Sequence, residues 1–407
     1  MASFSIPFTF SLILSILSVS AQSIDRTLNS VIFTTNTPSP LPSHHPLQSD
    51  DLRPIDIVLL ASVDGRFYGL NRTTGEVVWT TDAPGSKAID LYALVRTEHP
   101  ELGGGASMVD MDNRSLSSED IFIIEPQSGH IFLNPAGARC DGPLQRLPFS
   151  MAQLVDMSPF RFDDGKTFVG KKRSSFISLD LRLGKIMEIS DPEQSTRGDG
   201  RNELSDELLD RLDGTVVYIR RTDYHVSVFS KGRVIQNLTY SAYDPKDIDK
   251  KVKYLWHQMP DSWYHQPTPD GSLLVFKTDE REPLRHLVKF EHPIVAVFDT
   301  VTTSDRTYPL LLLQPTPSLQ DLYPSRREEV TKLALKGRIV YVGRIGDSLY
   351  ALSHQTYPHV LFSLLPTQRT FEDDSLYRLF HDTNEFGEGC TSLDCLIGAH
   401  YIETASP

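Results

Sequence analysis

The chain has 407 residues, of which 39% are hydrophobic and 23% are charged. At roughly 150 residues a domain, this length allows two or three domains or one large β architecture. The composition excludes collagen-like, coiled-coil and wholly disordered chains. The 40 basic and 53 acidic side chains give a formal net charge of −13, so we do not expect the chain to bind nucleic acid through its phosphates.

The N-terminus has the features of an export signal. An uncharged, apolar run covers residues 2–20, and the small residues Ser20 and Ala21 fit a signal-peptidase site. We therefore predict a cleaved signal peptide over residues 1–21, the alternative being a buried N-terminal helix. Residues 22–54 are rich in Ser, Thr and Pro without a sustained period, and we expect a flexible lead-in there.

Glycosylation sequons agree with export. They lie at Asn71, Asn113 and Asn237, and each follows the Asn-x-Ser/Thr pattern. Beyond the N-terminus, no apolar stretch approaches the roughly 18 to 20 residues that span a bilayer. The sequence as given therefore predicts a luminal or secreted chain.

Three cysteines are too few for a disulfide scaffold, even in an oxidising compartment. Cys390 and Cys395 are close enough to close a small loop. Cys140 would then be free or available for an intermolecular bond, because the turn signal Asp141-Gly142-Pro143 after it predicts a surface position. Without a neighbouring His pair, we do not expect these cysteines to form a zinc site.

Short β-rich runs alternate with Gly, Asp and Asn, and hairpin signals stand at Asp64-Gly65 and Ser128-Gly129. This spacing favours an all-β body that begins near residue 55. The expected strands are Ile57–Ala61, Phe67–Leu70, Val77–Thr80, Ile121–Ile124 and Ile131–Leu133.

Three segments share one register, which suggests an internal repeat. They cover residues 61–71, 170–180 and 343–353, and each runs from a small residue to a Leu nine positions later. We interpret each as strand, turn and strand, the hairpin unit of pyrroloquinoline-quinone-type propeller blades. The alternative is three coincidental hairpins.

Two kinds of segment interrupt the β pattern. Pro148–Ser158 predicts a short helix, in which Ser150 and Gln153 form a capping box and Phe149 packs against Leu154. Residues 191–213 are polar and acidic and predict an exposed insertion. Residues 314–327 contain three prolines among polar residues and predict a weak boundary between two parts of the chain.

No catalytic constellation is found in the sequence. The nucleophile-elbow, zinc-protease, phosphate-loop and kinase motifs are absent. A quinoprotein enzyme needs a Trp docking motif in most of its blades, and this chain has three Trp in all. We therefore expect the blade signature to serve as architecture, with no cofactor in this chain.

Five segments resemble one family. The most specific is LPFSMAQLVDMSPF at 147–160, followed by DDG and the FVGKK strand; the others are VDGRFYGLNRTTGEVVW at 63–79, IFIIEPQSGHIFLN at 121–134, DDGKTFVGKKRSSFISLD at 163–180 and RRTDYHVSVFS at 220–230. Together they resemble the luminal domain of the inositol-requiring kinase/endoribonuclease, fungal type, the stress sensor of the unfolded-protein response. The resemblance covers about residues 56–399.

The resemblance implies a mainly β sensor domain with few short helices, propeller-derived, over residues 55–400, with a linker starting at 401–407. It implies a type I membrane protein of the endoplasmic reticulum whose kinase and endoribonuclease, with their ATP and Mg, lie outside this chain. The implied partners are a second copy, the luminal Hsp70 chaperone and unfolded polypeptides, with no nucleic acid. The alternatives are a quinoprotein-type propeller enzyme or scaffold, and the luminal domain of the related translation-initiation-factor kinase.

The resemblance also implies a dimer interface on one strand. Lys172 matches a basic position of the family's dimer strand, Ser174 replaces a common acidic residue, Phe176 replaces a Trp, and Tyr224 matches the tyrosine of an RTxY motif. From its alternation, Phe168–Leu179 is expected to be an edge strand, with Ser178 also facing the partner. The alternative is an ordinary edge strand that Lys171, Lys172 and Arg173 protect from pairing.

Overall fold

The structure is a computed structural model. It describes residues 52–81, 93–98, 120–138, 142–162, 164–190, 215–245, 256, 261–303, 308–336, 338–364 and 393–403. All of them belong to one compact unit, Leu47–Pro407. The predicted signal peptide, nearly all of the lead-in, the 191–213 insertion, Asn113, Cys140 and Cys390 lie outside the described residues. The backbone of Cys395 is described as part of the 3-10 helix Leu393–Leu396, but its side chain lies outside the described part of the structure.

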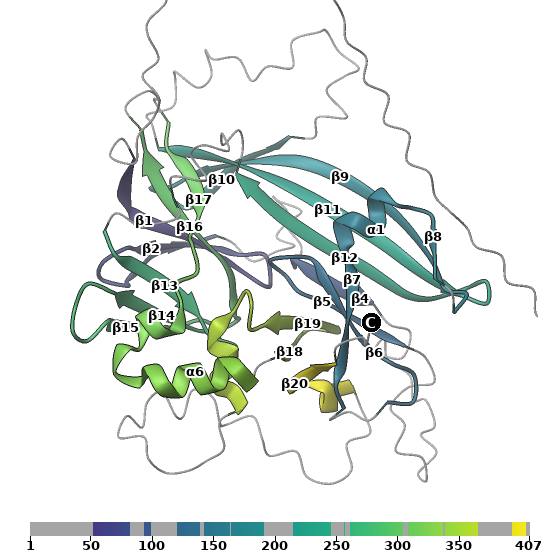
Figure 1. Ribbon diagram of the computed structural model, residues 1–407. Helices are drawn as coiled ribbons and strands as arrows, with labels where there is room; N and C mark the ends of the chain where they lie inside the picture. Colours follow the sequence, from purple (N-terminus) through teal and green to yellow (C-terminus); the bar gives the residue numbers. More distant parts are fainter. Residues whose placement is uncertain are drawn as a thin grey trace, which may run out of the picture. The chain divides into compact units, whose positions relative to one another are not determined.

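The N-terminal hairpins belong to a five-stranded antiparallel sheet (Figure 1). Its strands, in spatial order, are β17 (Leu310–Leu313), β16 (Ile294–Thr302), β1 (Arg53–Ser62), β2 (Phe67–Asn71) and β3 (Val77–Thr80). Gly65 adopts a φ of 90° in the turn between β1 and β2, a conformation that glycine reaches without strain. The three strands predicted between residues 57 and 80 are confirmed.

A small closed barrel forms a second sheet. Its strands, in order around the barrel, are β18 (Ile339–Ile345), β19 (Ser348–Ser353), β5 (Ile121–Ile124), β6 (His130–Asn134), β7 (Leu144–Ser150) and β20 (Gly398–Glu403). Apolar side chains that include Ile123, Phe132 and Val342 fill its interior. The predicted strands at 121–124 and 131–133 are confirmed.

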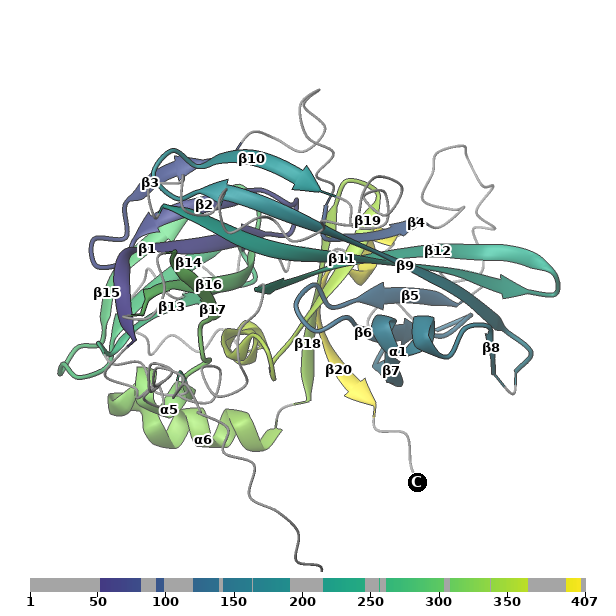
Figure 2. The ribbon, with the colours of Figure 1, turned by 90° about the horizontal axis from the view of Figure 1, so that it is seen from above.

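The longest strands form a third sheet, which carries the predicted dimer strand (Figure 2). Its strands, in order, are β10 (Lys185–Ser190), β9 (Thr167–Asp180), β11 (Val216–Ser230), β12 (Arg233–Pro245) and β4 (Val95–Glu98), and β8 (Phe160–Arg161) pairs with β9. A separate three-stranded sheet consists of β13 (Trp263–Pro267), β14 (Ser272–Lys277) and β15 (Leu284–Lys289).

β9 and β11 bury opposite faces at their two ends. Near the start of β9, Phe168 packs with Val228 in the largest core cluster. Near its end, Ile177 and Ile219 pack with Trp79 beside the five-stranded sheet. Because successive side chains point to opposite faces of a strand, even-numbered residues of β9 are buried at one end and odd-numbered residues at the other.

Helices are few and short among the described residues. The helical segments are α1 (Met151–Asp156), α5 (Leu319–Leu322), η2 (Pro324–Arg326), α6 (Arg327–Lys336), η3 (Pro358–Leu364) and η4 (Leu393–Leu396). The predicted capping box of α1 is confirmed, since Ser150 and Gln153 exchange both hydrogen bonds. In contrast, the sequence reading treated 314–327 as a boundary and missed α5 and α6, which pack their apolar side chains on the core.

The structure confirms a mainly β fold with several sheets and one small barrel, but it does not show a propeller. Two of the three repeats are hairpins, at 61–71 and 343–353. The third prediction is wrong, because residues 170–180 continue through the single strand β9. The hairpins have a glycine with positive φ at their turns, Gly65 and Gly346, whereas the corresponding positions of β9 hold cationic and serine residues that β11 pairs along their whole length.

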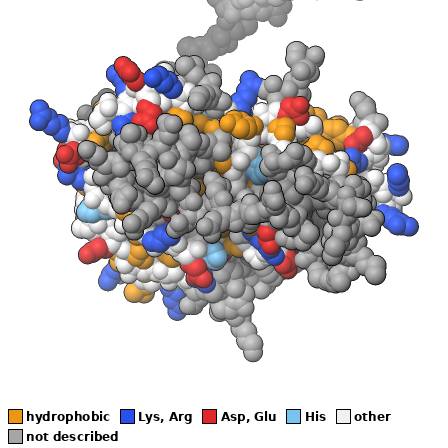
Figure 3. Space-filling view, turned by 90° about the horizontal axis from the view of Figure 1, so that it is seen from below, with side chains coloured by type: hydrophobic (Ala, Val, Ile, Leu, Met, Phe, Trp, Pro, Cys, Tyr) orange, Lys and Arg blue, Asp and Glu red, His pale blue; other side chains and the backbone are white. Residues whose placement is uncertain are grey.

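Two further observations concern the surface charges and possible membrane-spanning helices. On the face seen in Figure 3, acidic and basic side chains are interspersed beside a band of apolar side chains. No helix in the described part of the chain is both long and apolar enough to cross a membrane.

Candidate functional site

The predicted dimer strand β9 has one fully paired side and one partly open side. β11 pairs with it from Thr167 to Asp180. On the other side, β8 reaches Phe168, and β10 pairs with Phe176–Asp180, its last residue, Ser190, lying opposite Phe176. β8 and β10 lie at opposite ends of β9 (Figure 2). Between them, no strand of the described residues pairs with Val169–Ser175 on this side. The predicted edge is therefore confined to seven residues of the strand.

The backbone direction along this open segment follows from one hydrogen bond. The Gly170 N–H donates to Ser158 Oγ at 2.8 Å, so it points away from β11. Because backbone groups alternate in an antiparallel ladder, Lys172 and Ser174 also direct their N–H and C=O groups outward. Within the described residues, these groups have no backbone partner. The open edge thus offers two donors and two acceptors from these two residues.

Helix α1 lies over the start of this edge (Figures 1 and 2). A Cβ atom on Gly170 would stand 2.8 Å from Val155 Cγ2 and 2.9 Å from Val155 Cα, so only glycine allows this approach. The Lys172 Nζ lies 2.9 Å from Asp156 Oδ1, and both side chains are more than half exposed. The hydrogen bond and charge of Asp156 raise the pKa of Lys172 above its ordinary value.

The predicted interface residues share one face but not one environment. Lys172 pairs with Tyr224 in the ladder, and the Tyr224 ring stacks on Tyr240. Ser174 Oγ lies 3.2 Å from the hydroxyl of Thr222 on β11. These contacts place Lys172, Ser174 and Tyr224 together at the open segment.

Phe176 and Ser178 lie elsewhere on β9. Phe176 pairs with Ser190 of β10, and the guanidinium carbon of Arg220 lies 5.3 Å from the centre of its ring. Ser178 is 9% exposed and is paired on both sides, with Glu188 of β10 and with β11. The prediction of an open edge through Leu179 is wrong from Phe176 onward, because β10 covers that part.

The sequence reading missed Asp156 and Ser158. Both lie at the end of α1, and they reach β9 over a gap of 16 and 12 residues. Nothing in the local pattern distinguishes them, since an acidic residue and a serine before a proline are ordinary at a helix end. Only the docking of α1 on β9 brings them to the edge.

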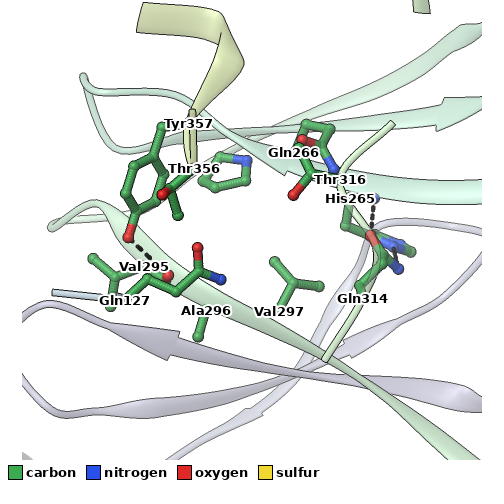
Figure 4. Close-up of a pocket in the computed structure, with 11 residues that line it drawn as sticks. Gln127, His265, Gln266, Val295, Ala296, Val297, Gln314, Thr316, Thr356 and Tyr357 are labelled. Atoms are coloured by element: carbon green, nitrogen blue, oxygen red, sulfur yellow. Dashed lines mark hydrogen bonds between the residues drawn. The ribbon is translucent and has the colours of Figure 1, made fainter. Parts of the chain in front are cut away.

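A small cavity lies elsewhere, beside β13 and β16 (Figure 4). Gln127, His265 and Tyr357 are among its lining residues, and its volume is about 20 Å³. The Tyr357 hydroxyl donates to the Val295 carbonyl at 3.0 Å. This volume suits about one water molecule, far below the roughly 300 Å³ of small-molecule sites. We therefore do not regard the cavity as the functional site.

A cluster of buried charged groups lies beside β16. Arg72, which is 2% exposed, forms a two-point ion pair with Asp261 and reaches Asp299 at 2.5 Å. Trp256 and Gln314 also donate to Asp299, at 3.1 and 2.9 Å. Burial raises the pKa of Asp299. Burial alone would lower the pKa of Arg72, but the ion pairs of Arg72 with Asp261 and Asp299 raise it above its ordinary value. Every polar group in this cluster has a partner within the protein, so its geometry is that of a structural network.

Two of the three sequons are described. Asn71 uses its Oδ1 to accept hydrogen bonds from the backbone N–H groups of Thr73 and Thr74, at 3.1 and 2.9 Å. Asn237 is exposed on β12. Its ladder neighbours on β11 and β9 are Ser227 and Val169, so Asn237 projects from the face opposite Lys172.

Comparisons with known proteins agree with the resemblance. The chain is 26% identical over 365 residues to "Serine/threonine-protein kinase/endoribonuclease IRE1" of Hypocrea jecorina, covering 85% of this chain and 27% of the relative. It is 26% identical over 382 residues to "Serine/threonine-protein kinase/endoribonuclease ireA" of Aspergillus fumigatus, covering 89% and 30%. Over most of its length the chain is similar to IRE1-type proteins, in the part that corresponds to the luminal sensor domain. It thus spans under a third of the length of these two relatives.

Further comparisons support the same assignment. "Sensor for unfolded proteins in the ER ire1" of Schizosaccharomyces pombe is 25% identical over 76% of this chain. The solved compact lumenal domain of yeast Ire1 matches 88% of this chain and 99% of its own, with a TM-score of 0.60 and 21% identity, and so shows a shared fold. No protein-family model matches the chain. The relationship implies the luminal side of the endoplasmic reticulum.

Proposed function

We propose that this IRE1-type domain senses unfolded protein by reversible self-association through the open segment of β9. The observation that carries the proposal is the pair of outward-facing residues, Lys172 and Ser174, between the ends of β8 and β10. A second copy can satisfy their backbone groups across a two-fold axis. The short length of the segment makes this pairing weak, so it can respond to changes in other partners.

The remaining partners follow from the family. The luminal Hsp70 chaperone would hold the domain in its unassociated state, and unfolded polypeptides would favour the associated one. A linker and one transmembrane helix would carry the signal to a cytosolic kinase and endoribonuclease outside this chain. In this arrangement the full-length protein would be a single-pass type I membrane protein. The proposed propeller ancestry of the fold has the two hairpins at 61–71 and 343–353 as its support.

The test is a proline at the open edge. Ser174→Pro removes one outward N–H from each copy without breaking a bond to β11, and an edge strand tolerates proline at such a position. We expect the dimer dissociation constant, measured by analytical ultracentrifugation, to rise about tenfold or more, since two hydrogen bonds are lost per dimer.

The matched control is Ser174→Ala, which removes the hydroxyl and keeps the N–H. It should associate nearly as the parent does. If the proline variant is folded by circular dichroism and associates as tightly as the parent, the β9 edge is not the association surface. Adding an unfolded polypeptide should raise the dimer fraction of the parent and of Ser174→Ala, and should raise that of Ser174→Pro less.

A further inference from the structure

The open segment of β9 is cationic, which opposes pairing with its own copy. Lys171, Lys172 and Arg173 follow one another along it. In the antiparallel two-fold register that pairs the outward groups of Lys172 with those of Ser174, Lys172 lies opposite the partner's Ser174 and diagonal to the partner's Lys172. Diagonal neighbours across such a pair lie about 7–8 Å apart. Two ammonium groups therefore approach each other on the same face.

Within the strand itself, nothing balances this charge on the face of Lys172. Ser174, the next residue on that face, is uncharged. The carboxylate that reaches Lys172 comes from helix α1 instead, with Asp156 Oδ1 at 2.9 Å from Nζ. A second acidic group, Asp223, lies beside Arg173 in the β11 ladder.

We infer that Asp156 is the counter-ion that allows the cationic edge of β9 to pair with the same edge of a second copy. This inference rests on the proposed self-association and adds a specific residue to it. Asp156 neutralises Lys172 within its own copy, so on the face of Lys172 the two-fold pair brings together two neutral ion pairs in place of two cations.

The position of Asp156 is fixed before association. The capping box of Ser150 and Gln153 sets the start of α1, and the contact of Gly170 with Val155 brings the helix against β9. Ser158 then accepts the Gly170 N–H at the end of the same segment. Because these contacts lie on both sides of Asp156 along the chain, little backbone freedom has to be lost there when the dimer forms.

The experiment compares two single charge deletions in the full chain, expressed in a host without N-glycosylation, because Asp156→Asn creates an Asn-x-Ser sequon over residues 156–158. Asp156→Asn removes the proposed counter-ion. Asp164→Asn removes the same charge in the turn between β8 and β9, where Asp164 pairs with Lys166. The chain carries a net charge of −13, so deletion of a carboxylate that plays no local part should leave the dimer unchanged or make it slightly tighter.

We expect the two variants to change the strength of the dimer in different directions. At low salt, Asp156→Asn should weaken the dimer about three- to tenfold, whereas Asp164→Asn should not weaken it. At about 0.5 M salt the effect of Asp156→Asn should largely disappear, because the repulsion is screened. The double variant Asp156→Asn with Lys172→Gln should return to within about twofold of the parent. Asp156 ends α1, where a carboxylate is unfavourable to the helix dipole, so its replacement should not harm folding.

Each other outcome has a definite meaning. If folded Asp156→Asn dimerises as tightly as the parent, or more tightly as Asp164→Asn does, the counter-ion role is wrong. If Ser174→Pro weakens the dimer while Asp156→Asn does not, only this inference fails. If Ser174→Pro has no effect either, the β9 edge itself is not the association surface and the proposed function fails with it.

Discussion

At the scale of single residues, Arg72 links segments that are far apart in the chain. It follows β2, and its guanidinium holds Asp261, which precedes β13, and Asp299, in β16. Through Asp299 it is connected to Trp256 and Gln314. Removing one partner of a buried ion pair leaves the other charge without compensation, which costs far more than the pair contributes.

Arg72→Met tests this network. The variant keeps most of the side-chain volume and also the sequon, and we expect it to lower the free energy of unfolding by about 3–5 kcal/mol, measured by urea denaturation. The control is Arg96→Met, because Arg96 pairs with Glu98 at the surface and both are about half exposed. It should cost less than about 1 kcal/mol. Equal losses in the two variants would contradict the structural role of the network.

A buried histidine makes stability depend on pH. His359 is fully buried, and burial lowers its pKa to about 3, whereas an unfolded histidine titrates near ~6.5. Between these values the unfolded chain binds a proton that the folded chain excludes. The free energy of unfolding therefore falls as the pH falls, by about 1.4 kcal/mol per pH unit for this group. His265 adds a change of the same sign, and Asp299, with its raised pKa, opposes it.

Replacing His359 should flatten this dependence. Urea denaturation of His359→Phe at pH 7, 6 and 5 should give a slope smaller by about 1.4 kcal/mol per pH unit in the lower part of this range. The control is Tyr323→Phe, which removes the hydroxyl that lies 3.1 Å from His359 Nε2 and keeps the histidine. Its slope should equal that of the parent. Parallel curves for the parent and His359→Phe would show that this histidine does not control the acid response.

At the scale of elements, the docking of α1 on β9 depends on the absence of a side chain at Gly170. In Gly170→Ala the new Cβ would meet both the side chain and the backbone of Val155, so α1 must move away from the strand. We expect a loss of about 1–3 kcal/mol in the free energy of unfolding and faster hydrogen exchange in α1. Ser175→Ala, on the same strand, should show neither change. An unchanged exchange rate in Gly170→Ala would contradict this close packing.

At the scale of the whole molecule, the export signal and sequons predict at least one N-linked glycan. The structure favours Asn237 among the two described sites, because it is exposed and lies on the face of the sheet opposite Lys172. We expect glycosidase to shift the mobility of the parent, and this shift to be smaller for Asn237→Gln. The same variant should dimerise as the parent does. No shift in the parent would contradict the predicted secretory route.

The sequence alone could predict the features that depend on neighbouring residues. The turns at Gly65 and Gly346, the capping box of α1 and the strands between residues 57 and 80 follow from such local rules. The resemblance directed attention to β9, and Lys172, Ser174 and Tyr224 lie together at its open segment. The same local rules failed at residues 170–180, where the repeat pattern suggested a hairpin and β9 instead continues as one strand paired with β11.

Tertiary structure alone decided which part of β9 is open and which groups surround it. An edge is defined by where neighbouring strands end, and the positions of β8 and β10 cannot be read from the residues of β9 itself. The approach of Asp156 to Lys172 likewise depends on the packing of α1, and the partners of Arg72 come from segments about 190 and 230 residues away. The chain's local pattern thus determined its elements, while long-range pairing and packing determined its candidate interface.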